Sequence, residues 1–394
     1  FAPGLRVLVL HGPGRKDRFG AIPEHDLVVT TYPLLNRDHE ELFKHKFELA
    51  ILDEAQAAKN PVAAVSKRIR DIDARQRLAL TGTPMENNLE ELWSLFDWLV
   101  PGLLGDRKSF NAEFRRPIER HGDRFRQKRL SARVKPFLLR RAKEDVVKDL
   151  PPKTIIDEIT PLDTAQAALY ESIRSAMDKR VRDAIAAKGV AGSRITILDA
   201  LLKLRQACCD PALVKLDAAR KVTSSAKRER LLSMLEELVA EGRKVLIFSQ
   251  FVSMLKLIEA DVAARGWSYS LLHGSTKDRE AELARFQVGE TQLFLISLKA
   301  GGVGLNLTAA DTVILYDPWW NPAVERQAMD RAHRIGQNKP VFVHRLIAEN
   351  TVEAAIQEMQ ARKQALADAL FEGTGEGALA LTEADIDLLL GRMK

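Results

Sequence analysis

The sequence predicts an α/β protein with two parallel-sheet lobes and helical insertions between them. Short apolar runs of strand length recur in the first hundred residues and again after Lys244, and helical patterns separate many of them. Strands of parallel sheets read as near-continuous apolar runs because helices cover both faces of such sheets. With 394 residues the chain is long enough for two or three cores, and 46% hydrophobic with 29% charged residues is ordinary for a soluble α/β protein.

Composition excludes several classes of protein. No apolar run approaches the ~20 residues that a membrane helix needs, and FAPGLRVLVL has neither the basic leader nor the cleavage site of a secretory signal. The two cysteines, Cys208 and Cys209, are adjacent, which excludes a disulfide framework and a cysteine zinc site and is typical of a reducing compartment. We expect both to be helix-packing residues. The eight histidines show no metal-ligand spacing.

The first hundred residues contain four strand-like runs with helical patterns between some of them. These runs are Leu5–Leu10, Asp26–Thr31, Leu49–Leu52 and Arg77–Leu80. A long, mostly helical stretch follows from about Glu90 to Leu150. Pro151 and Pro152 then fix an extended link, because proline holds its own φ and restricts the residue before it. Helices resume from Ala165 to Leu216.

A second α/β series starts at Lys244. Its predicted strands lie in KVLIFSQF, SYSLLHGS, TQLFLISL, DTVILYD and VFVHRLI. A helix is expected near Val352–Phe371, then a glycine-rich break at 373–377 and a short helix with Thr382 as its N-cap. We therefore divide the chain into a first lobe (1–100), a basic helical insertion (101–150), a linker with a second helical insertion (151–230), a second lobe (231–350) and a C-terminal helix and tail (351–394).

One segment carries the basic excess of the chain. The net charge is +6, yet Asp106–Asp149 contains 15 Lys and Arg against 7 Asp and Glu, which is +8 and leaves about −2 for the rest. Clustered positive charge predicts a surface for phosphates, and the alternative is a solvated helical face. Arg140 and Arg141, in the run KPFLLRR, either brace the two lobes or lie on a solvated face.

Two of the predicted strands end in polar loops. FELAIL runs into Asp53, Glu54 and Gln56, and RLAL runs into the loop Thr81–Pro84. Open α/β sheets bind ligands at the carboxyl ends of their strands. An acidic pair there can hold a hydrated Mg²⁺ through Asp53 and polarise an attacking water through Glu54. The alternative is the ordinary preference of helix N-termini for acidic residues.

Two loops of the second series have residues that suit phosphate. Ala300–Asn306 follows the strand LFLISL, and its glycines let backbone N–H groups approach phosphate or ribose, unless the loop is a plain turn. His273, Gly274 and Ser275 end another strand and can donate to a nucleic-acid phosphate.

An arginine-rich run, QAMDRAHRIGQ, follows these loops. As a helix it would place Gln327, Arg331 and Arg334 on one stripe that suits a polyanion, with Ile335–Gly336 ending the helix. A solvated helix face is the alternative. Together with the acidic strand end, the stripe describes a nucleotide site split between two lobes, in which arginines stabilise the transferring γ-phosphoryl by about 10³ to 10⁵ in rate.

Eight segments in chain order resemble the signatures of the Swi/Snf-type ATPases of helicase superfamily 2. They are FELAILDEAQ, LALTGTPMENNLEELWSLFDWL, KPFLLRRAKEDVVKDLPPK, LRQACCDP, KVLIFSQF, LLHGSTKDREAELARFQ, AGGVGLNLTAADTVILYDPWWNP and QAMDRAHRIGQ. The resemblance spans about Leu5 to Ala355, and the last two segments are highly specific. It implies two RecA-like lobes, the first incomplete, with helical insertions in the 162 residues between Thr81 and Lys244.

The resemblance also implies roles for individual residues. Asp53 and Glu54 would be motif II, and Gln327, Arg331 and Arg334 would be motif VI, with the two arginines as γ-phosphate fingers. Further nucleotide contacts are expected from Gln56, Gly302, Gly304 and Asn306. DNA contacts are expected from Thr30, Thr31, Thr81, Gly82, Gln250, Gly274, Ser275, Lys299, Gly301 and Trp320. Trp319 and Trp320 have packing between the lobes as their alternative role.

Three departures from the family pattern affect these expectations. Gln56 replaces the usual histidine of the acidic box, and its amide can still hydrogen-bond across the cleft. Ser297–Ala300 reads Ser-Leu-Lys-Ala in place of Ser-Thr-Arg-Ala, which removes a hydroxyl and keeps a charge at Lys299. No Gly-Lys dipeptide occurs, so the phosphate-cradling loop G-x-x-x-x-G-K-[ST] is missing. Gly12–Asp17 does not replace it, because Asp17 would repel phosphate.

The functional expectation concerns a longer protein with a P-loop upstream of Phe1. It would hydrolyse ATP with Mg²⁺ between its lobes and move along double-stranded DNA towards a DNA-bound protein such as a nucleosome or a polymerase. We expect a monomer in the cytoplasm or nucleoid of a prokaryote, or in the nucleus of a eukaryote. The alternative is a non-catalytic fragment or module that binds duplex DNA, and we expect the isolated chain to lack ATPase activity.

Overall fold

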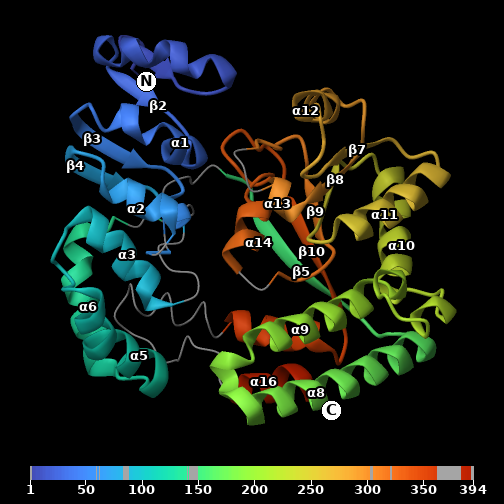
Figure 1. Ribbon diagram of the computed structural model, residues 1–394. Helices are drawn as coiled ribbons and strands as arrows, with labels where there is room; N and C mark the ends of the chain where they lie inside the picture. Colours follow the sequence, from blue (N-terminus) through green and yellow to red (C-terminus); the bar gives the residue numbers. More distant parts are fainter. Residues whose placement is uncertain are drawn as a thin grey trace. The chain divides into compact units, whose positions relative to one another are not determined.

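The computed structural model describes residues 2–58, 60–61, 63–82, 88–139, 141, 150–301, 305–319, 322–361 and 383–391. The chain divides into two compact units, and each is described by itself. Unit 1 contains the described residues up to Leu138, and unit 2 contains those from Leu139 onward. In Figure 1 unit 1 runs from blue to teal, and unit 2 runs from green to red.

Unit 1 contains four strands in two parallel pairs, which confirms the four predicted strands. The pairs are β1 (Val7–Val9) with β2 (Leu27–Val29), and β3 (Phe47–Leu52) with β4 (Ala74–Ala79). The connections are helical, as parallel strands require. They comprise a 3-10 segment (Pro13–Glu24), α1 (Tyr32–Leu42), a 3-10 turn (Ala55–Ala58) and α2 (Ala64–Arg70).

The strands of unit 1 bury only one of their faces. Leu8, Leu10 and Leu52 pack into a core with residues of α1, α2 and α3 (Leu89–Leu99). Alternate residues on the other face are 40–49% exposed, namely Val7, Val9, Leu27, Val29, Leu49, Ile51, Leu78 and Leu80. Parallel sheets are usually covered on both faces, so this apolar face is unusual for the fold class.

Several short helices, rather than one continuous one, follow the strands of unit 1. They are α3 (Leu89–Leu99), α4 (Arg107–Phe110), a π-helical turn (Asn111–Arg115), α5 (Arg116–His121) and α6 (Arg124–Val134). Asn88, Asp106 and Asp123 cap three of them by accepting backbone N–H bonds. Their apolar faces form a second core around Phe110, Phe114 and other side chains. Most of the run from Arg140 to Asp149 lies outside the described residues.

Unit 2 contains a six-stranded parallel sheet in the order β5-β10-β9-β6-β8-β7. Its strands are β5 (Lys153–Thr160), β6 (Val245–Ser249), β7 (Tyr269–Leu272), β8 (Leu293–Ser297), β9 (Thr312–Leu315) and β10 (Val341–Ala348). All five strands predicted from the second series are confirmed.

The strand β5 corrects one expectation, because the sequence predicted only an extended link there. Residues Lys153–Thr160 pair in parallel with Val341–Ala348 at the edge of the sheet. Ile155 and Ile159 are 45% and 54% exposed. An edge strand with exposed apolar residues lacks the buried run by which the central strands are recognised, so sequence patterning did not indicate it.

Helices cover both faces of this sheet (Figure 1). Val245 and Ile247 pack against α10 (Ala226–Ala240) and α11 (Val252–Ala264). Leu246 and Phe248 point to the opposite core, which includes residues of α12 (Arg279–Val288), α13 (Leu298–Gly301) and α14 (Pro322–Met329). The period of two along β6 thus divides its side chains between two dry layers.

A separate helical core lies beside the sheet of unit 2. It is built from α8 (Thr164–Gly192), α9 (Arg194–Cys209), the helical residues 352–361 and α16 (Glu383–Leu390). Two 3-10 turns, Pro211–Leu213 and Ala219–Lys221, complete the predicted helical region. Cys208 and Cys209 are fully buried, which confirms them as packing residues, and burial raises the pKa of both thiols. Residues 362–382 lie outside the described part of the chain.

A buried ion pair joins α10 to the helix at 352–361. The side chains of Lys227 and Glu353 are both 0% exposed, and Lys227 Nζ donates to both carboxylate oxygens at 2.9 Å. Burial, the largest single effect, would by itself lower the pKa of Lys227, but the groups around it, Glu353 foremost, together raise the pKa. The backbone N–H of Ala348 also donates to Glu353, at 2.8 Å.

Removing one partner of this pair should destabilise unit 2. We expect Lys227→Met to lower the free energy of unfolding by about 3–5 kcal/mol, because it leaves a buried carboxylate without its counter-ion. The double variant Lys227→Met/Glu353→Leu should recover much of that loss. Lys203→Met, which removes a part-exposed pair with Asp199, is the control and should cost under about 1 kcal/mol. Chemical denaturation measures all three, and equal losses for Lys227→Met and Lys203→Met would contradict the expectation.

Candidate functional site

The acidic strand end of unit 1 lies in a tight turn directly after β3. Asp53 and Glu54 are both exposed, and Glu54 has a left-handed backbone with φ of 47°. A positive φ is uncommon for a residue other than glycine, and such residues cluster at functional sites. Among the bonds that hold the turn, Glu54 N–H donates to Asp53 Oδ1 at 3.0 Å, and the Tyr32 hydroxyl donates to the Asp53 carbonyl at 2.6 Å.

Tyr32 is fixed as a donor at this turn by its environment. Burial, followed by the negative charges of Asp53 and Glu54, raises the pKa of Tyr32 to about 12. A phenol with this pKa stays protonated at neutral pH, so its O–H continues to donate. Sequence analysis missed Tyr32, which opens α1 and has no motif of its own.

Gln56 connects the acidic turn to the neighbouring strand end. Its amide Nε2 donates to Glu54 Oε2 at 2.7 Å, and its Oε1 accepts from the Thr81 hydroxyl at 2.8 Å. The strand ends also share backbone bonds, since Ala55 N–H donates to the Leu80 carbonyl at 2.9 Å. The structure therefore brings Asp53, Glu54, Gln56 and Thr81 together. Both of these hydrogen bonds of the Gln56 side chain are made to residues of unit 1.

The other predicted residues of unit 1 lie on adjoining loops. The Thr30 hydroxyl donates to the Leu10 carbonyl at 3.4 Å, and exposed Thr31 occupies the N-cap of α1 without a capping side-chain bond. Gly82 is exposed after β4. Thr83 and Pro84 lie outside the described residues.

Gln250 lies at the carboxyl edge of the sheet in unit 2. Its backbone N–H donates to the two carboxylate oxygens of Asp317, at 3.3 and 3.4 Å. The Ser249 hydroxyl donates to the same carboxylate at 2.5 Å. Asp317 follows β9, so this carboxylate joins the ends of two neighbouring strands, and sequence analysis did not single it out.

The remaining predicted loops of unit 2 lie at other strand ends. Gly274 and Ser275 are exposed, and the Ser275 N–H donates to His273 Nδ1 at 3.3 Å. Lys299 and Gly301 lie in α13, whose Ala300 N–H donates to the Ser297 hydroxyl oxygen at 3.3 Å. Asn306 is exposed, and its carbonyl accepts from Gln287 Nε2 at 2.6 Å. Gly302, Gly304 and Trp320 lie outside the described residues.

The arginine-rich run differs from its prediction. The helix α14 ends at Met329, so Gln327 is helical whereas Arg331 and Arg334 follow in turns and do not share a helical stripe with it. Bonds between residues three apart appear here: Arg331 N–H donates to Ala328 and Ala332 N–H donates to Met329, whose carbonyl also accepts from His333 N–H at 3.3 Å. The predicted helix end at Ile335–Gly336 is therefore wrong by about two turns.

Long-range bonds explain why the helix stops early. The carbonyl of Arg331 accepts from Leu307 N–H at 3.0 Å, which removes it from any helical ladder. Buried Gln337 donates Nε2 to the carbonyls of Thr308, Ala310 and Ala332 at 3.1, 2.7 and 3.0 Å. Its Oε1 also accepts two backbone N–H groups of the following residues. Gln337 thus fixes the turn. In the local sequence the turn is indicated by Gly336, whose φ is 101°.

The two arginines lie in different environments. Arg331 is 5% exposed, and its Nη1 donates to the Leu305 carbonyl at 3.4 Å, whereas Arg334 is exposed. His333, between them, bonds through Nε2 to the Pro151 carbonyl at 2.7 Å. The turn thus buries one guanidinium and presents the other to solvent.

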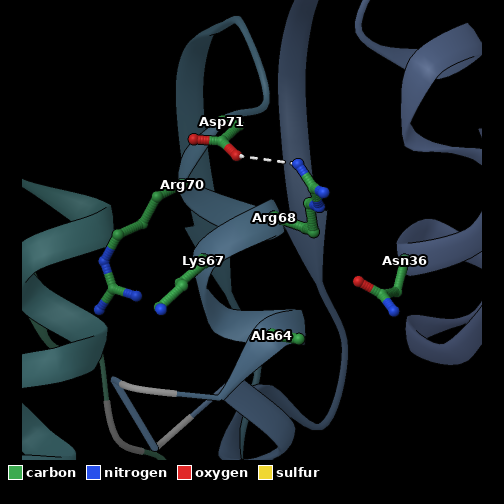
Figure 2. Close-up of a pocket in the computed structure, with 6 residues that line it drawn as sticks. All are labelled: Asn36, Ala64, Lys67, Arg68, Arg70 and Asp71. Atoms are coloured by element: carbon green, nitrogen blue, oxygen red, sulfur yellow. Dashed lines mark ion pairs between the residues drawn. The ribbon is translucent and has the colours of Figure 1, made fainter.

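Figure 2 shows a surface hollow of about 520 Å³ between α1 and α2. It is lined by Asn36, Ala64, Lys67, Arg68, Arg70 and Asp71. Arg68 pairs with Asp71 at 3.9 Å, and Arg70 Nε donates to Asp97 at 2.9 Å. None of the predicted site residues lines this hollow, and part of its positive charge is already paired.

Within the described ranges, no group of three or more His, Cys, Asp or Glu side chains is placed to hold a metal. No helix in the part of the chain that the structure describes is long and apolar enough to cross a membrane.

Comparisons with known proteins define the family. The SNF2-related domain matches residues 1–213, and the helicase conserved C-terminal domain matches residues 226–336. YwqA of Bacillus subtilis is 40% identical over 382 residues, which are 94% of this chain and 41% of that protein. The human SWI/SNF-related matrix-associated actin-dependent regulator of chromatin subfamily A member 1 is 38% identical over 379 residues, which cover 91% of this chain and 35% of that protein.

A solved structure supports the same assignment. The Sulfolobus solfataricus SWI2/SNF2 ATPase core in complex with dsDNA is 33% identical to this chain, with a TM-score of 0.50. The match covers 100% of this chain and 82% of that one. The chain belongs to the Swi/Snf-type family of ATP-dependent helicases and chromatin-remodelling ATPases. It spans about two-fifths or less of the length of the two curated relatives.

The turn after α14 should depend on Gln337. We expect Gln337→Leu to lower the free energy of unfolding of unit 2 by about 2–3 kcal/mol, because buried carbonyls would lose their donor. Gln287→Leu removes one exposed amide bond and should stay within about 0.5 kcal/mol of wild type. Denaturant unfolding of both variants checks this, and equal stabilities would show that the turn does not need the amide.

Proposed function

We propose that the protein is an ATP-dependent motor that moves along double-stranded DNA, as part of a longer chain with a complete nucleotide site. The observation that carries the proposal is the cluster of Asp53, Glu54, Gln56 and Thr81 at the carboxyl edge of β3 and β4, in a chain of the Swi/Snf-type family. Carboxyl ends of parallel strands are where such folds bind nucleotides.

In this proposal the acidic turn carries the hydrolytic chemistry. Asp53 would hold a hydrated Mg²⁺, which when bound would neutralise charge on the nucleotide phosphates. Glu54 would accept the proton of the attacking water. The Gln56 amide, which donates to Glu54 Oε2 at 2.7 Å, holds that carboxylate in position. The Tyr32 hydroxyl fixes the backbone of the same turn from the other side.

The turn after α14 would supply positive charge to the same reaction. Arg334 is exposed, which suits a guanidinium that reaches a phosphate. Arg331 is buried and bonded to the Leu305 carbonyl, so for this residue a role in shaping the turn is supported as much as a phosphate contact. Gln327, on α14, and the loops with Gly302, Gly304 and Asn306 complete the proposed nucleotide contacts.

Duplex DNA is the proposed track. The related ATPase core of Sulfolobus solfataricus has been solved in complex with dsDNA. In this chain the basic segment forms α4 to α6, where Lys108, Arg116 and Lys128 are exposed. Exposed cations on a rigid helical insertion suit contacts to a phosphate backbone. The predicted DNA contacts, named above from Thr30 to Trp320, remain part of this proposal. The division of the chain into five segments, a monomeric state and a DNA-bound protein cargo also remain part of it.

We further propose that the isolated chain does not turn over ATP. The sequence contains no Gly-Lys dipeptide, and hence no P-loop lysine. The exposed apolar face of β1 to β4 supports the same idea, since further polypeptide is needed to cover it. A non-catalytic duplex-binding module is the second candidate, and it is favoured for the 394 residues alone. A prokaryotic cytoplasm or nucleoid is the proposed location.

Hydrolysis by the longer protein is the first test. We expect duplex DNA at low salt to stimulate its ATPase activity, and Glu54→Gln to lower kcat by about 10²- to 10⁴-fold, the range for loss of a general base. Glu48→Gln, an exposed glutamate near the start of the same strand, is the matched control and should leave kcat unchanged. Absence of DNA stimulation in the wild-type protein would count against a DNA motor.

Binding by the isolated chain is the second test. We expect weak duplex binding that falls steeply with salt, because the contacts release counter-ions from phosphates. Lys128→Gln/Lys135→Gln should flatten the slope of log K against log salt by about 1–2. Arg220→Gln/Lys221→Gln, an equal charge loss on an exposed turn of unit 2, should leave the slope near wild type. An identical slope in all three proteins would exclude α6 from the binding surface. The proposal that the isolated chain does not hydrolyse ATP would be contradicted by hydrolysis that the substitution Glu54→Gln abolishes.

A further inference from the structure

The turn Asp317–Trp319, between β9 and α14, is held by side chains from segments far apart in sequence. On the sheet side, the Asp317 carboxylate is 1% exposed and accepts from the Ser249 hydroxyl and the Gln250 N–H. The position of Gln250 therefore depends on where this carboxylate lies. Gln250, which bonds to Asp317, is a predicted DNA contact, and another, Trp320, follows this turn in the sequence.

Arg205 of α9 approaches the turn from the helical core. Its Nη2 donates to the Pro318 carbonyl at 2.5 Å and lies 3.7 Å from Asp317 Oδ2. The guanidinium also lies 5.9 Å from the ring centre of Phe251 and 6.0 Å from that of Trp319. Arg205 is only 8% exposed. A planar guanidinium can donate to a carbonyl, pair with a carboxylate and lie over aromatic rings at once, which an ammonium cannot do.

Gln360, from the helix at 352–361, fixes the far end of the turn. Its Nε2 donates to the Trp319 carbonyl and, at 3.2 Å, to Glu325 Oε1. Glu325 in turn accepts from Trp319 N–H at 2.5 Å. Gln360 and Glu325 are 6% and 3% exposed, so these bonds are shielded from water. The backbone of Trp319 is thereby bonded through both its N–H and its carbonyl.

We propose that Arg205 is a positioning residue for DNA engagement, which fixes the Asp317–Trp319 turn and, through Asp317, the backbone of Gln250. Gln360 supports it from the opposite side. The proposal rests on the proposed function, because it assigns Arg205 to the track-binding step of the motor and not to the hydrolytic step. The bonds of Arg205 end on the Asp317–Trp319 turn rather than on the arginine-rich turn, so phosphate chemistry should not respond directly to its substitution.

Steady-state kinetics of the longer protein separate these two steps. We expect Arg205→Lys to raise the DNA concentration for half-maximal ATPase stimulation by about tenfold, the effect of losing one charge-assisted hydrogen bond. The value of kcat at saturating DNA and the KM for ATP should stay within about twofold of wild type. Arg230→Lys, an exposed pair with Glu158, is the matched control and should change none of these. A fall in kcat with unchanged DNA dependence, or wild-type behaviour of Arg205→Lys, would overturn the proposal.

Fluorine NMR of the 394-residue chain labelled with 5-fluorotryptophan tests the geometry without requiring activity. Arg205→Lys should shift the resonance of Trp319, assigned with Trp319→Phe, and leave those of Trp93, Trp98 and Trp267 in place. If DNA did not stimulate ATP hydrolysis by the wild-type longer protein, both the proposed function and the DNA role of Arg205 would be contradicted. An unmoved Trp319 resonance alongside normal stimulation of the wild-type protein would overturn the positioning role alone.

Discussion

Burial of both faces of a parallel sheet is the constraint on which the rest of this structure depends. In unit 2 it is met, because alternate residues of β6 enter two separate cores and the whole strand is buried. Along β6 the one polar side chain stands at the carboxyl end, where the Ser249 hydroxyl donates to Asp317. In unit 1 the same constraint is met on one face only, which is why apolar residues such as Val7 and Ile51 remain half-exposed.

The strand ends show how the sheet positions chemistry. Parallel pairing of β3 and β4 brings both the acidic turn and Thr81 within hydrogen-bonding reach of the Gln56 side chain. Gln56 and Thr81 are 25 residues apart in the sequence. The histidine that the family pattern has at this position is replaced by an amide that donates and accepts at once. A left-handed backbone at Glu54 and the Tyr32 hydroxyl, which donates to the Asp53 carbonyl, complete the turn.

Sequence patterning predicted the parts of the fold that local composition determines. Central strands such as β6 and β8 are continuous apolar runs, and they were located nearly to their ends. The edge strand β5 was not predicted, because its isoleucines are exposed and its pairing with β10 depends on residues almost two hundred positions away. The early end of α14 was also missed, since the turn after it depends on residues far away in sequence: Leu307 N–H donates to the Arg331 carbonyl, and Gln337 Nε2 donates to the carbonyls of Thr308 and Ala310. Arg205, Gln337 and Gln360 act through distant backbone partners. Arg205 and Gln337 lie in signature segments of the sequence, but their roles were not predicted, because their partners lie elsewhere in the chain.

Movement along duplex DNA is tested most directly by displacement of a triplex-forming third strand by the longer protein, with strand unwinding measured on the same duplex. ATP-dependent displacement of the third strand, without separation of the duplex and lost in Glu54→Gln, is the result that the proposed motor predicts. Absence of displacement despite DNA-stimulated hydrolysis would contradict translocation, and separation of the duplex strands would identify a true helicase instead.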